Sequence, residues 1–204
     1  MPDAVTRPLR ADAARNRARI LEAARAAFAE GGLDVGVEEI ARRAGVGKGT
    51  LYRRFPTKES LVLAIFDDRL ADLERFAAAA GEEPDAWEAL AGFLADAARL
   101  QADNQGFFEV VAAQGGGVLT PELRGRFLAV LAAPLRRAQE AHCVREDLVP
   151  ADVTLLVRML GATTRPLPDG QPMEDRWRRY LGLLLDGLRP AAATPLPAPP
   201  WEPR

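Results

Sequence analysis

A short run of cationic and hydroxyl-bearing side chains near the amino terminus is the strongest candidate for chemistry in this sequence. Ammonium and guanidinium groups bind phosphates and guanine acceptor atoms, and hydroxyls bond phosphate oxygens or base edges. A glycine among them lets a backbone approach closely. The residues predicted to contact DNA are Lys48, Gly49, Thr50, Tyr52, Arg53, Arg54 and Lys58.

These side chains need a scaffold, and residues 37–55 predict two short helices joined by a glycine-containing turn. Ile40 faces inward on the first helix, and Leu51 and Phe55 do so on the second. Gly45 follows the first helix, where a left-handed backbone costs least without a Cβ atom. This pattern is typical of a helix–turn–helix, in which the second helix enters a DNA groove.

The distribution of charge supports the same interpretation. The whole chain of 204 residues has a net charge of −2, so it is no polycation. Residues 1–60, however, contain 12 Lys and Arg against 8 Asp and Glu, and the remaining residues contain 15 against 21. A basic amino-terminal part on an acidic body indicates a nucleic-acid face confined to one end.

Catalytic chemistry is hard to place in this sequence. The one histidine, His142, and the one cysteine, Cys143, are adjacent, and neighbouring helical side chains point too far apart for a nucleophile–base pair. A single cysteine also excludes an intramolecular disulfide and a multi-cysteine zinc site. Hydrolase, metalloprotease and P-loop motifs are missing from the sequence. We therefore expect a protein that is not an enzyme, with no cofactor and no metal.

The stretch Ala41-x-x-Ala-Gly-Val-Gly-Lys-Gly-Thr-Leu-Tyr-x-x-Phe-Pro-Thr-Lys-Glu-Ser-Leu61 resembles the signature of the TetR family of bacterial transcriptional regulators. The match runs from about Ile20 to Ile65 and keeps the spacing of the glycines, the aromatic residues and the trailing lysine. The remaining residues are similar to the family only in layout, as a run of helices of suitable lengths.

The resemblance also implies roles for individual side chains. Thr50 and Lys58 would hold phosphates, and the two arginines that end the second motif helix would add base or backbone contacts. Gly36 and Gly47 depart from the pattern, because the family usually has Thr or Ser capping the motif helices there. Glycine caps cost only a few tenths of a kcal/mol against a hydroxyl, so the fold should survive. Recognition should then depend on the second helix rather than on capping hydroxyls.

Helical spacing of apolar residues continues through the rest of the chain. The fold class is therefore predicted to be all-α, with about nine helices, the first over residues 12–30 and a long one starting at Lys58. The predicted organisation is a flexible arm at 1–11, a helix–turn–helix DNA-binding domain at 12–57, a ligand-binding and dimerisation domain at 58–189, and a proline-rich disordered tail at 190–204.

Two apolar helices near the carboxyl terminus are expected to form a homodimer interface. The helix over residues 151–163 has almost no polar face, and the one over residues 172–188 has a wide apolar stripe. A chain this short has few other residues that could cover both helices. We therefore expect a second copy of the chain to cover them, with two helices from each copy forming a four-helix interface. Burial within one chain is the alternative. The interface residues predicted are Leu155, Leu156, Met159, Tyr180, Leu181, Leu184 and Leu188.

Residues 84–189 are expected to hold a small-molecule inducer. Pockets of this kind have apolar and aromatic walls with few polar groups. Pro134 falls inside a predicted helix and should kink it, which either opens a cavity or only adapts the helix to the surface. The candidate pocket residues, for each of which ordinary core packing is the alternative, are Phe93, Phe107, Phe108, Phe127, His142, Met159 and Trp177.

Together these features favour a ligand-responsive, sequence-specific DNA-binding transcriptional regulator. It would bind a pseudo-palindromic operator as a homodimer, and the family resemblance implies repression and release by an unknown small molecule. The alternative is a ligand-binding or protein-interaction dimer whose helix–turn–helix is vestigial. The start of the sequence has no apolar segment typical of a secretion signal. Nowhere in the sequence is there an uncharged apolar run long enough to span a membrane. We therefore expect a soluble, cytoplasmic protein with no membrane partner.

Overall fold

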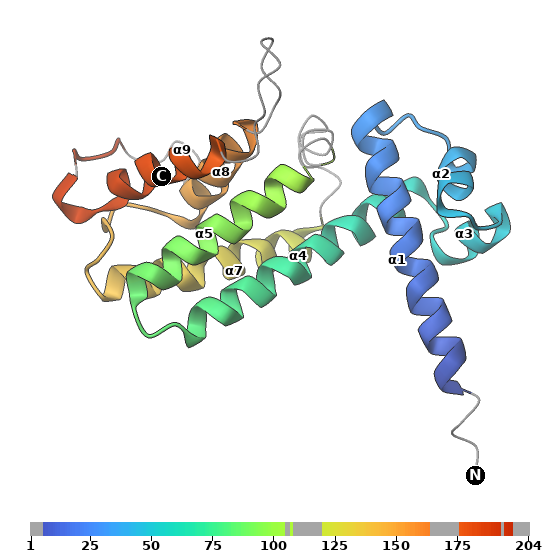
Figure 1. The fold of residues 1–204 in the computed structure, drawn as a ribbon, viewed down its shortest axis with the longest axis horizontal. Coiled ribbons are helices and arrows are strands. Elements are labelled where there is room, and N and C mark those ends of the chain that lie inside the picture. Colours follow the sequence, from blue (N-terminus) through green and yellow to red (C-terminus); the bar gives the residue numbers. More distant parts are fainter. Residues whose placement is uncertain (1–5, 105–106, 108–119, 164–175, 193, 198–204) are drawn as a thin grey trace. The chain divides into compact units, whose positions relative to one another are not determined.

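The computed structural model describes residues 6–104, 107, 120–163, 176–192 and 194–197. Over these residues it contains helices and no strand, which confirms the all-α class (Figure 1). The eight α-helices described are close to the nine expected. They are α1 (Thr6–Gly31), α2 (Val37–Ala44), α3 (Lys48–Arg54), α4 (Lys58–Glu82), α5 (Ala86–Asp103), α7 (Pro121–Glu140), α8 (Pro150–Ala162) and α9 (Arg176–Leu188), followed by a 3-10 turn at Pro190–Ala192.

Helix α1 begins at Thr6, six residues before the expected start. The sequence pattern missed this turn because it contains Pro8 and has no apolar stripe. A proline in the first turn of a helix removes no intrahelical hydrogen bond, so it is tolerated there. The arm predicted at the amino terminus is therefore helical from Thr6 onward.

The chain divides into two compact units. The first contains Met1–Ala71 and Asn104–Leu123, and the second contains Asp72–Asp103 and Arg124–Arg204. Helix α4 belongs to both, because it starts in the first unit and ends in the second. One continuous helix therefore joins the two units covalently.

The core of the first unit is built from α1, α2, α3 and the first half of α4. Its members are apolar side chains no more than 9% exposed. Phe107, which is fully buried, packs into the same core although it lies about fifty residues further along the chain than α3. The core cluster comprises Ile20, Leu21, Ala24, Ala27, Phe28, Val37, Ile40, Ala41, Ala44, Leu51, Phe55, Leu61, Val62, Ile65 and Phe107.

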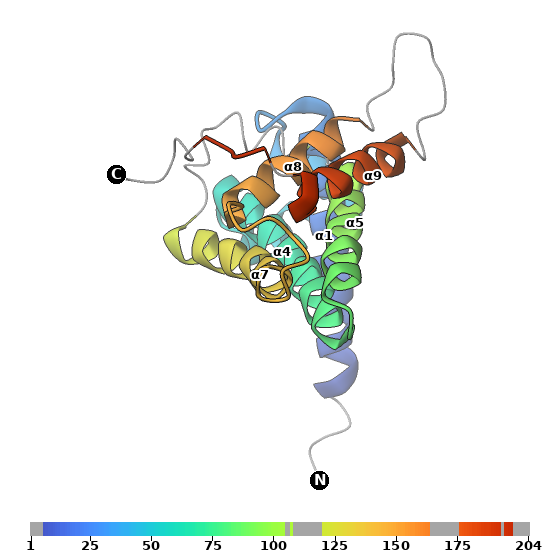
Figure 2. The same cartoon turned by 90° about the vertical axis from the view of Figure 1, so that its left-hand side faces the viewer.

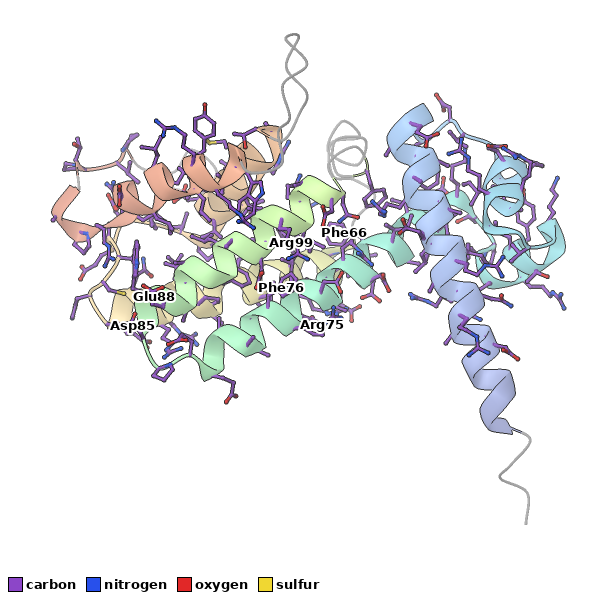
Figure 3. The ribbon with its side chains drawn as sticks, viewed as in Figure 1. Phe66, Arg75, Phe76, Asp85, Glu88 and Arg99 are labelled. Carbon is purple, nitrogen blue, oxygen red and sulfur yellow. The ribbon has the colours of Figure 1, made fainter. Side chains whose placement is uncertain are left out.

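In the second unit, α5 contacts both α8 and α9, and these two helices contact each other (Figure 2). Helix α5 begins at Ala86, two residues after Pro84. The Asp85 carboxylate caps it by accepting the N–H groups of Trp87 and Glu88 at 2.8 and 2.9 Å, and Figure 3 shows Asp85 and Glu88 at this end. A carboxylate at this position satisfies N–H groups that have no intrahelical partner.

The segment after α9 is held by the connector between α7 and α8. The Arg145 side chain, 9% exposed, donates to both carboxylate oxygens of Asp147 at 2.6 and 2.8 Å and to the carbonyl of Thr194. Asp147 in turn accepts the N–H of Leu196 at 3.1 Å. The hydrogen bond from Arg145, and then that from Leu196, holds the pKa of Asp147 well below its ordinary value. Residues 194–197 are thus tied to the second unit, although the sequence predicted an unpacked tail.

Some sequence-based expectations fall outside the described residues. They are Phe108, the start of the last helix at residue 172, and the end of the proline-rich tail from residue 198. No helix in the described ranges is both long and apolar enough to cross a membrane.

Candidate nucleic-acid interface

The turn between α2 and α3 has the geometry that its glycines predict. Gly45 ends α2 with φ 63° and ψ 37°, a left-handed conformation that an L side chain rarely adopts. The next N–H, of Val46, donates to the carbonyl of Ala41 at 3.1 Å, and that of Gly45 donates to Arg42 at 3.2 Å. These bonds satisfy the last carbonyls of α2, so α3 can begin at Lys48 without leaving them unpaired.

Helix α1 supplies a further bond to this turn that the sequence did not reveal. The guanidinium of Arg19 donates to the carbonyl of Ala44, the last residue of α2, at 2.7 Å. A cation at this end of a helix also interacts favourably with the helix dipole. Nothing in the local sequence pattern indicates this contact, because its partner lies twenty-five residues away.

The second motif helix exposes the residues predicted to contact DNA and buries those predicted to be structural. Leu51 and Phe55 are 1% and 6% exposed, and both pack into the core of the first unit. Of the seven predicted contact residues, Thr50 and Lys58 are half-buried. The exposed ones are Lys48, Gly49, Tyr52, Arg53 and Arg54. Their roles toward DNA stay a prediction.

Both lysines in this set have partners outside their own helices. Lys48 forms an ion pair with Glu38 of α2, and its amine lies 5.8 Å from the centre of the Tyr52 ring. Lys58 donates to the carbonyl of Leu33 at 2.7 Å, which ties the start of α4 to the loop before α2. Glu38 is not among the residues predicted to be functional, although a carboxylate ten residues before a lysine of the motif is a sequence signal for such a pair.

A second set of charges stabilises α2 itself. Arg42 donates twice to Glu39, at 2.8 and 2.7 Å, and Arg43 bonds both Glu39 and Glu30 of α1 at 2.7 Å. The hydrogen bonds from Arg42 and then Arg43 lower the pKa of Glu39 from its ordinary 4.5 to about 2. Glu39 therefore stays ionised well into the acid range.

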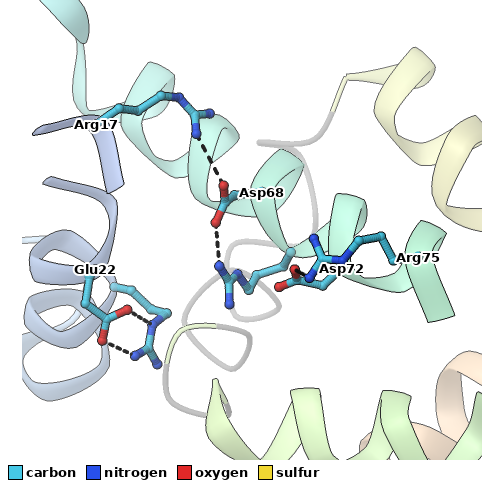
Figure 4. Close-up of polar contacts among 7 residues, drawn as sticks. Arg17, Glu22, Asp68, Asp72 and Arg75 are labelled. Carbon is cyan, nitrogen blue, oxygen red and sulfur yellow. Dashed lines mark hydrogen bonds and ion pairs between the residues drawn. The ribbon is translucent and has the colours of Figure 1, made fainter. Parts of the chain in front are cut away.

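Helix α1 is also joined to α4 by charge. Arg17 donates to the carboxylate of Asp68 at 3.2 Å, and Asp68 pairs in addition with Arg69 (Figure 4). The side chains of Arg17 and Asp68 are about one-third exposed. The pair fixes α1 against the part of α4 that belongs to the same unit.

The helices predicted to form a dimer interface present both buried and exposed apolar residues. Leu181 and Leu188 are buried within the chain, and Leu156 and Leu184 are half-buried. Leu155, Met159 and Tyr180, by contrast, are 40%, 60% and 41% exposed, and Leu183 beside them is 61% exposed. These four large apolar side chains of α8 and α9 are thus exposed. Two of them, Leu155 and Leu183, also line a groove of about 270 Å³, with walls that include Leu148, Leu156, Leu184 and Leu196.

Six of the seven candidate pocket residues are described, and they do not all lie in one unit. Phe93 is buried in the second unit, but Phe107 belongs to the core of the first unit. The side chain of His142 is 81% exposed and lies 3.3 Å from Glu146, and Met159 is also exposed. These two residues lie at the surface because α7 ends at Glu140 and because Met159 is on the outer side of α8.

Three pocket candidates stay compatible with a site inside the second unit. Phe93 is buried, and Phe127 and Trp177 are half-buried. Among the described residues, no group of His, Cys, Asp and Glu is placed to hold a metal ion.

Comparison with known proteins agrees with this geometry. The family model of bacterial regulatory proteins of the tetR family matches residues 20–65. The model of the C-terminal domain of SbtR-like transcriptional regulators matches residues 85–190. The chain is thus a helix–turn–helix DNA-binding transcriptional regulator. It belongs to the TetR family.

Individual relatives cover most of the chain. The HTH-type transcriptional regulator SrpR of Pseudomonas putida is 31% identical over 192 residues, which span 89% of this chain and 87% of SrpR. The TetR transcription regulatory protein of Mycobacterium vanbaalenii has a crystal structure that is 39% identical, with a TM-score of 0.62 over 89% of this chain and 99% of that one. Another similar structure has 28% identity to this chain, with a TM-score of 0.60 over 85% of this chain and 97% of that one. Its subject is the molecular basis for control of antibiotic production by a bacterial hormone.

Proposed function

We propose that this protein is a homodimeric transcriptional repressor that binds a pseudo-palindromic operator and releases it when a small molecule binds. The observation that carries the proposal is the division of α3 into two faces. Leu51 is buried in the core of the first unit, while Lys48, Tyr52 and Arg53 are exposed. A helix held in this way offers donors and an aromatic ring to the major groove.

The proposed homodimer is supported by the exposed apolar side chains of α8 and α9. A monomer rarely leaves so many large apolar residues together at its surface without a partner. A two-fold axis through this face would cover Leu155, Met159 and Leu183 of both copies with one another. Two motifs related by such an axis would contact two half-sites about one helical turn apart.

The proposed ligand site lies in the second unit, near Phe93, Phe127 and Trp177. It is supported by the burial of Phe93 and the partial burial of Phe127 and Trp177, all within the part of the chain that matches the regulator C-terminal domain model. The 28%-identical relative, whose structure concerns control by a bacterial hormone, also favours a small-molecule effector. A ligand that prefers one conformation would lower operator affinity by its differential binding energy, and α4 is the covalent connection through which it would act.

The test is a binding selection with the full chain on a library of random duplexes, followed by sequencing. We expect a pseudo-palindromic sequence to be enriched. On that duplex, Lys48→Ala should reduce discrimination against a scrambled duplex by about 1–3 kcal/mol, because Lys48 would bond a base. Absence of any enriched sequence would favour the alternative of a vestigial motif. Equal loss on both duplexes would show that Lys48 only positions the protein.

Regulation by a ligand needs a separate measurement. A compound that binds the second unit tightly should weaken binding to the selected duplex in a gel-shift titration. If operator affinity stays constant at saturating compound, the proposed coupling through α4 is wrong.

A further inference from the structure

The exposed amine of Lys48 lies between a carboxylate and an aromatic ring of its own unit. Its Nζ atom forms an ion pair with Oε1 of Glu38 and sits 5.8 Å from the centre of the Tyr52 ring. The side chains of Glu38 and Lys48 are 62% and 55% exposed, so both are open to solvent. The side chain expected to contact DNA thus already has a counter-ion.

Local structure explains why these two charges meet. Glu38 lies in the first turn of α2 and Lys48 is the first residue of α3, and the left-handed turn at Gly45 brings the two residues together. Gly36 leaves room for the carboxylate, since a Cβ atom there would lie 3.3 Å from Oε2 of Glu38. The hydrogen bond from Lys48 is the main cause that lowers the pKa of Glu38, and the same bond raises the pKa of Lys48. Both groups are therefore charged near neutral pH.

We propose that Glu38 competes with DNA for Lys48 and so weakens binding to duplexes of every sequence. This inference rests on the proposed contact between Lys48 and DNA. Glu38 touches no DNA in this mechanism: it acts through Lys48, as a positioning residue, and it lowers the affinity that the lysine would otherwise provide. The remaining contacts of α3, from Tyr52 and Arg53, then contribute a larger share of the discrimination between sequences.

The physical basis is the release of counter-ions. A lysine amine in a DNA groove adds one positive charge among the phosphates whether or not it also bonds a base. It thereby releases a condensed cation from any duplex, which contributes about 0.9 to the slope of log K against log salt concentration. A lysine that must first leave a carboxylate loses part of this gain, and the freed carboxylate then lies near the phosphates. Removing the carboxylate should therefore tighten binding and steepen the salt dependence.

Glu39 is a matched control in the same helical turn. It carries the same charge as Glu38, but its carboxylate is bonded by Arg42 and Arg43 and has no bond to Lys48 among the contacts described. Glu38→Gln and Glu39→Gln thus change the net charge equally, and only the first releases Lys48.

The experiment measures fluorescence anisotropy of labelled duplexes with the full-length wild-type chain, both variants, Lys48→Met and the double variant Glu38→Gln/Lys48→Met. The probes are the selected duplex and a random duplex of about 30 base pairs, over roughly 50–200 mM salt. We expect Glu38→Gln to bind both duplexes about three- to tenfold more tightly than wild type, the range of an exposed ion pair plus a nearby repulsion. Its salt slope should be steeper by up to about one. Glu39→Gln should bind as wild type does, and Glu38→Gln should give no gain in the Lys48→Met background.

Several results would overturn the inference. Unchanged affinity in Glu38→Gln would show that the pair does not oppose binding. An equal gain in Glu39→Gln, or a gain that persists without Lys48, would show a general effect of charge. Weaker binding of Glu38→Gln to the selected duplex alone would make Glu38 a base-reading residue. If wild type and all variants fail to bind either duplex, the proposed function fails as well, whereas tight wild-type binding with no gain overturns this inference alone.

Discussion

Single glycines in the helix–turn–helix serve different physical needs. Gly45 is required by its backbone, because φ is 63° there and an added Cβ would meet the Arg19 guanidinium at 2.6 Å. Gly36 and Gly47 have extended backbones that other residues adopt readily, with φ −68° at both. Gly49 is exposed on α3, and nothing in the chain lies within 4 Å of the place where its Cβ would be. Of these four glycines, only Gly49 lies within the predicted DNA-contact helix, and a Cβ atom added there would meet no other atom of the chain.

Gly49→Ala should therefore separate stability from DNA binding. Alanine stabilises an exposed helical position by roughly 0.5–1 kcal/mol relative to glycine, so the denaturant midpoint should rise. Binding to the selected duplex should weaken, because the added methyl keeps the helix backbone away from DNA. Gly92→Ala is the matched control, since Gly92 is exposed on α5 with equally open space. It should raise stability and leave DNA binding unchanged, and equal binding by both variants would contradict the role of Gly49.

The pKa of Glu39 makes a prediction about acid stability. Its pKa in the folded state is about 2 and its ordinary value is 4.5, so ionised Glu39 favours the folded state above pH 4.5. This contribution is lost as the pH falls from 4.5 through 2, and only below about pH 2 is the carboxylate protonated in both states. Glu39→Gln should thus unfold at a lower temperature than wild type at neutral pH, and the two should converge only below about pH 2 in a thermal melt. A difference that is independent of pH would show that the pairs with Arg42 and Arg43 do not contribute.

At the level of helices, the end of α4 is held by a side chain of α7. Arg137 donates to the carbonyl of Ala80 at 2.7 Å, to that of Pro84 at 2.9 Å, and to that of Glu83. These carbonyls lie in and just after the last turn of α4, where helices leave four acceptors without intrahelical partners. A guanidinium at this end also interacts favourably with the helix dipole. Arg137 therefore fixes the α4–α5 connector against α7.

Arg137→Ala should destabilise the second unit by about 1–2 kcal/mol, because it removes hydrogen bonds from a charged donor. Arg136→Ala is the control: its side chain is 73% exposed and its ion pair with Glu140 spans 3.7 Å. That substitution should change stability by less than about 0.5 kcal/mol. Urea unfolding followed by circular dichroism measures both, and equal losses would show that the bonds of Arg137 are not specific.

The helices also show which parts of the fold local sequence encodes. Ile20, Ala24 and Phe28 are four residues apart, which is the spacing of one helix face, and all three are fully buried on α1. The glycine-containing turn and α3 lie where the sequence placed them. Phe107 was predicted to line a pocket and instead packs in the core of the first unit. Its place depends on a contact with residues far away in the chain, which no local period reports.

For the molecule as a whole, the proposed homodimer depends on the exposed apolar side chains of α8 and α9. Leu155, Met159, Tyr180 and Leu183 remain 40–61% exposed in a single chain, whereas Leu181 and Leu188 are buried by the chain itself. The sequence showed that α8 has almost no polar face and that α9 has a wide apolar stripe. It did not show which side the chain covers and which side it leaves open for a second copy.

Leu183→Glu should separate the dimer without unfolding the monomer. Leu183 is 61% exposed, so a charge there is hydrated in the monomer but would be buried between two copies. Sedimentation velocity should show a monomer with helical content like that of wild type, and binding to the two-half-site duplex should weaken sharply. The control is Leu128→Glu, because Leu128 is 41% exposed on α7, away from this face. A dimer that persists in Leu183→Glu would place the interface elsewhere.

The sequence by itself determined the helical class, the helix–turn–helix and the set of side chains on α3 predicted to contact DNA. These features depend on turns, caps and periodicities that span only a few residues, so the local order of residues encodes them. The tertiary structure decided that Lys48 is paired with Glu38, that Arg19 caps α2, and that Arg145 and Asp147 hold the segment at residues 194–197. Each of these contacts joins residues that are ten to about fifty positions apart. Packing of the apolar core sets such distances, and a sequence pattern does not record them.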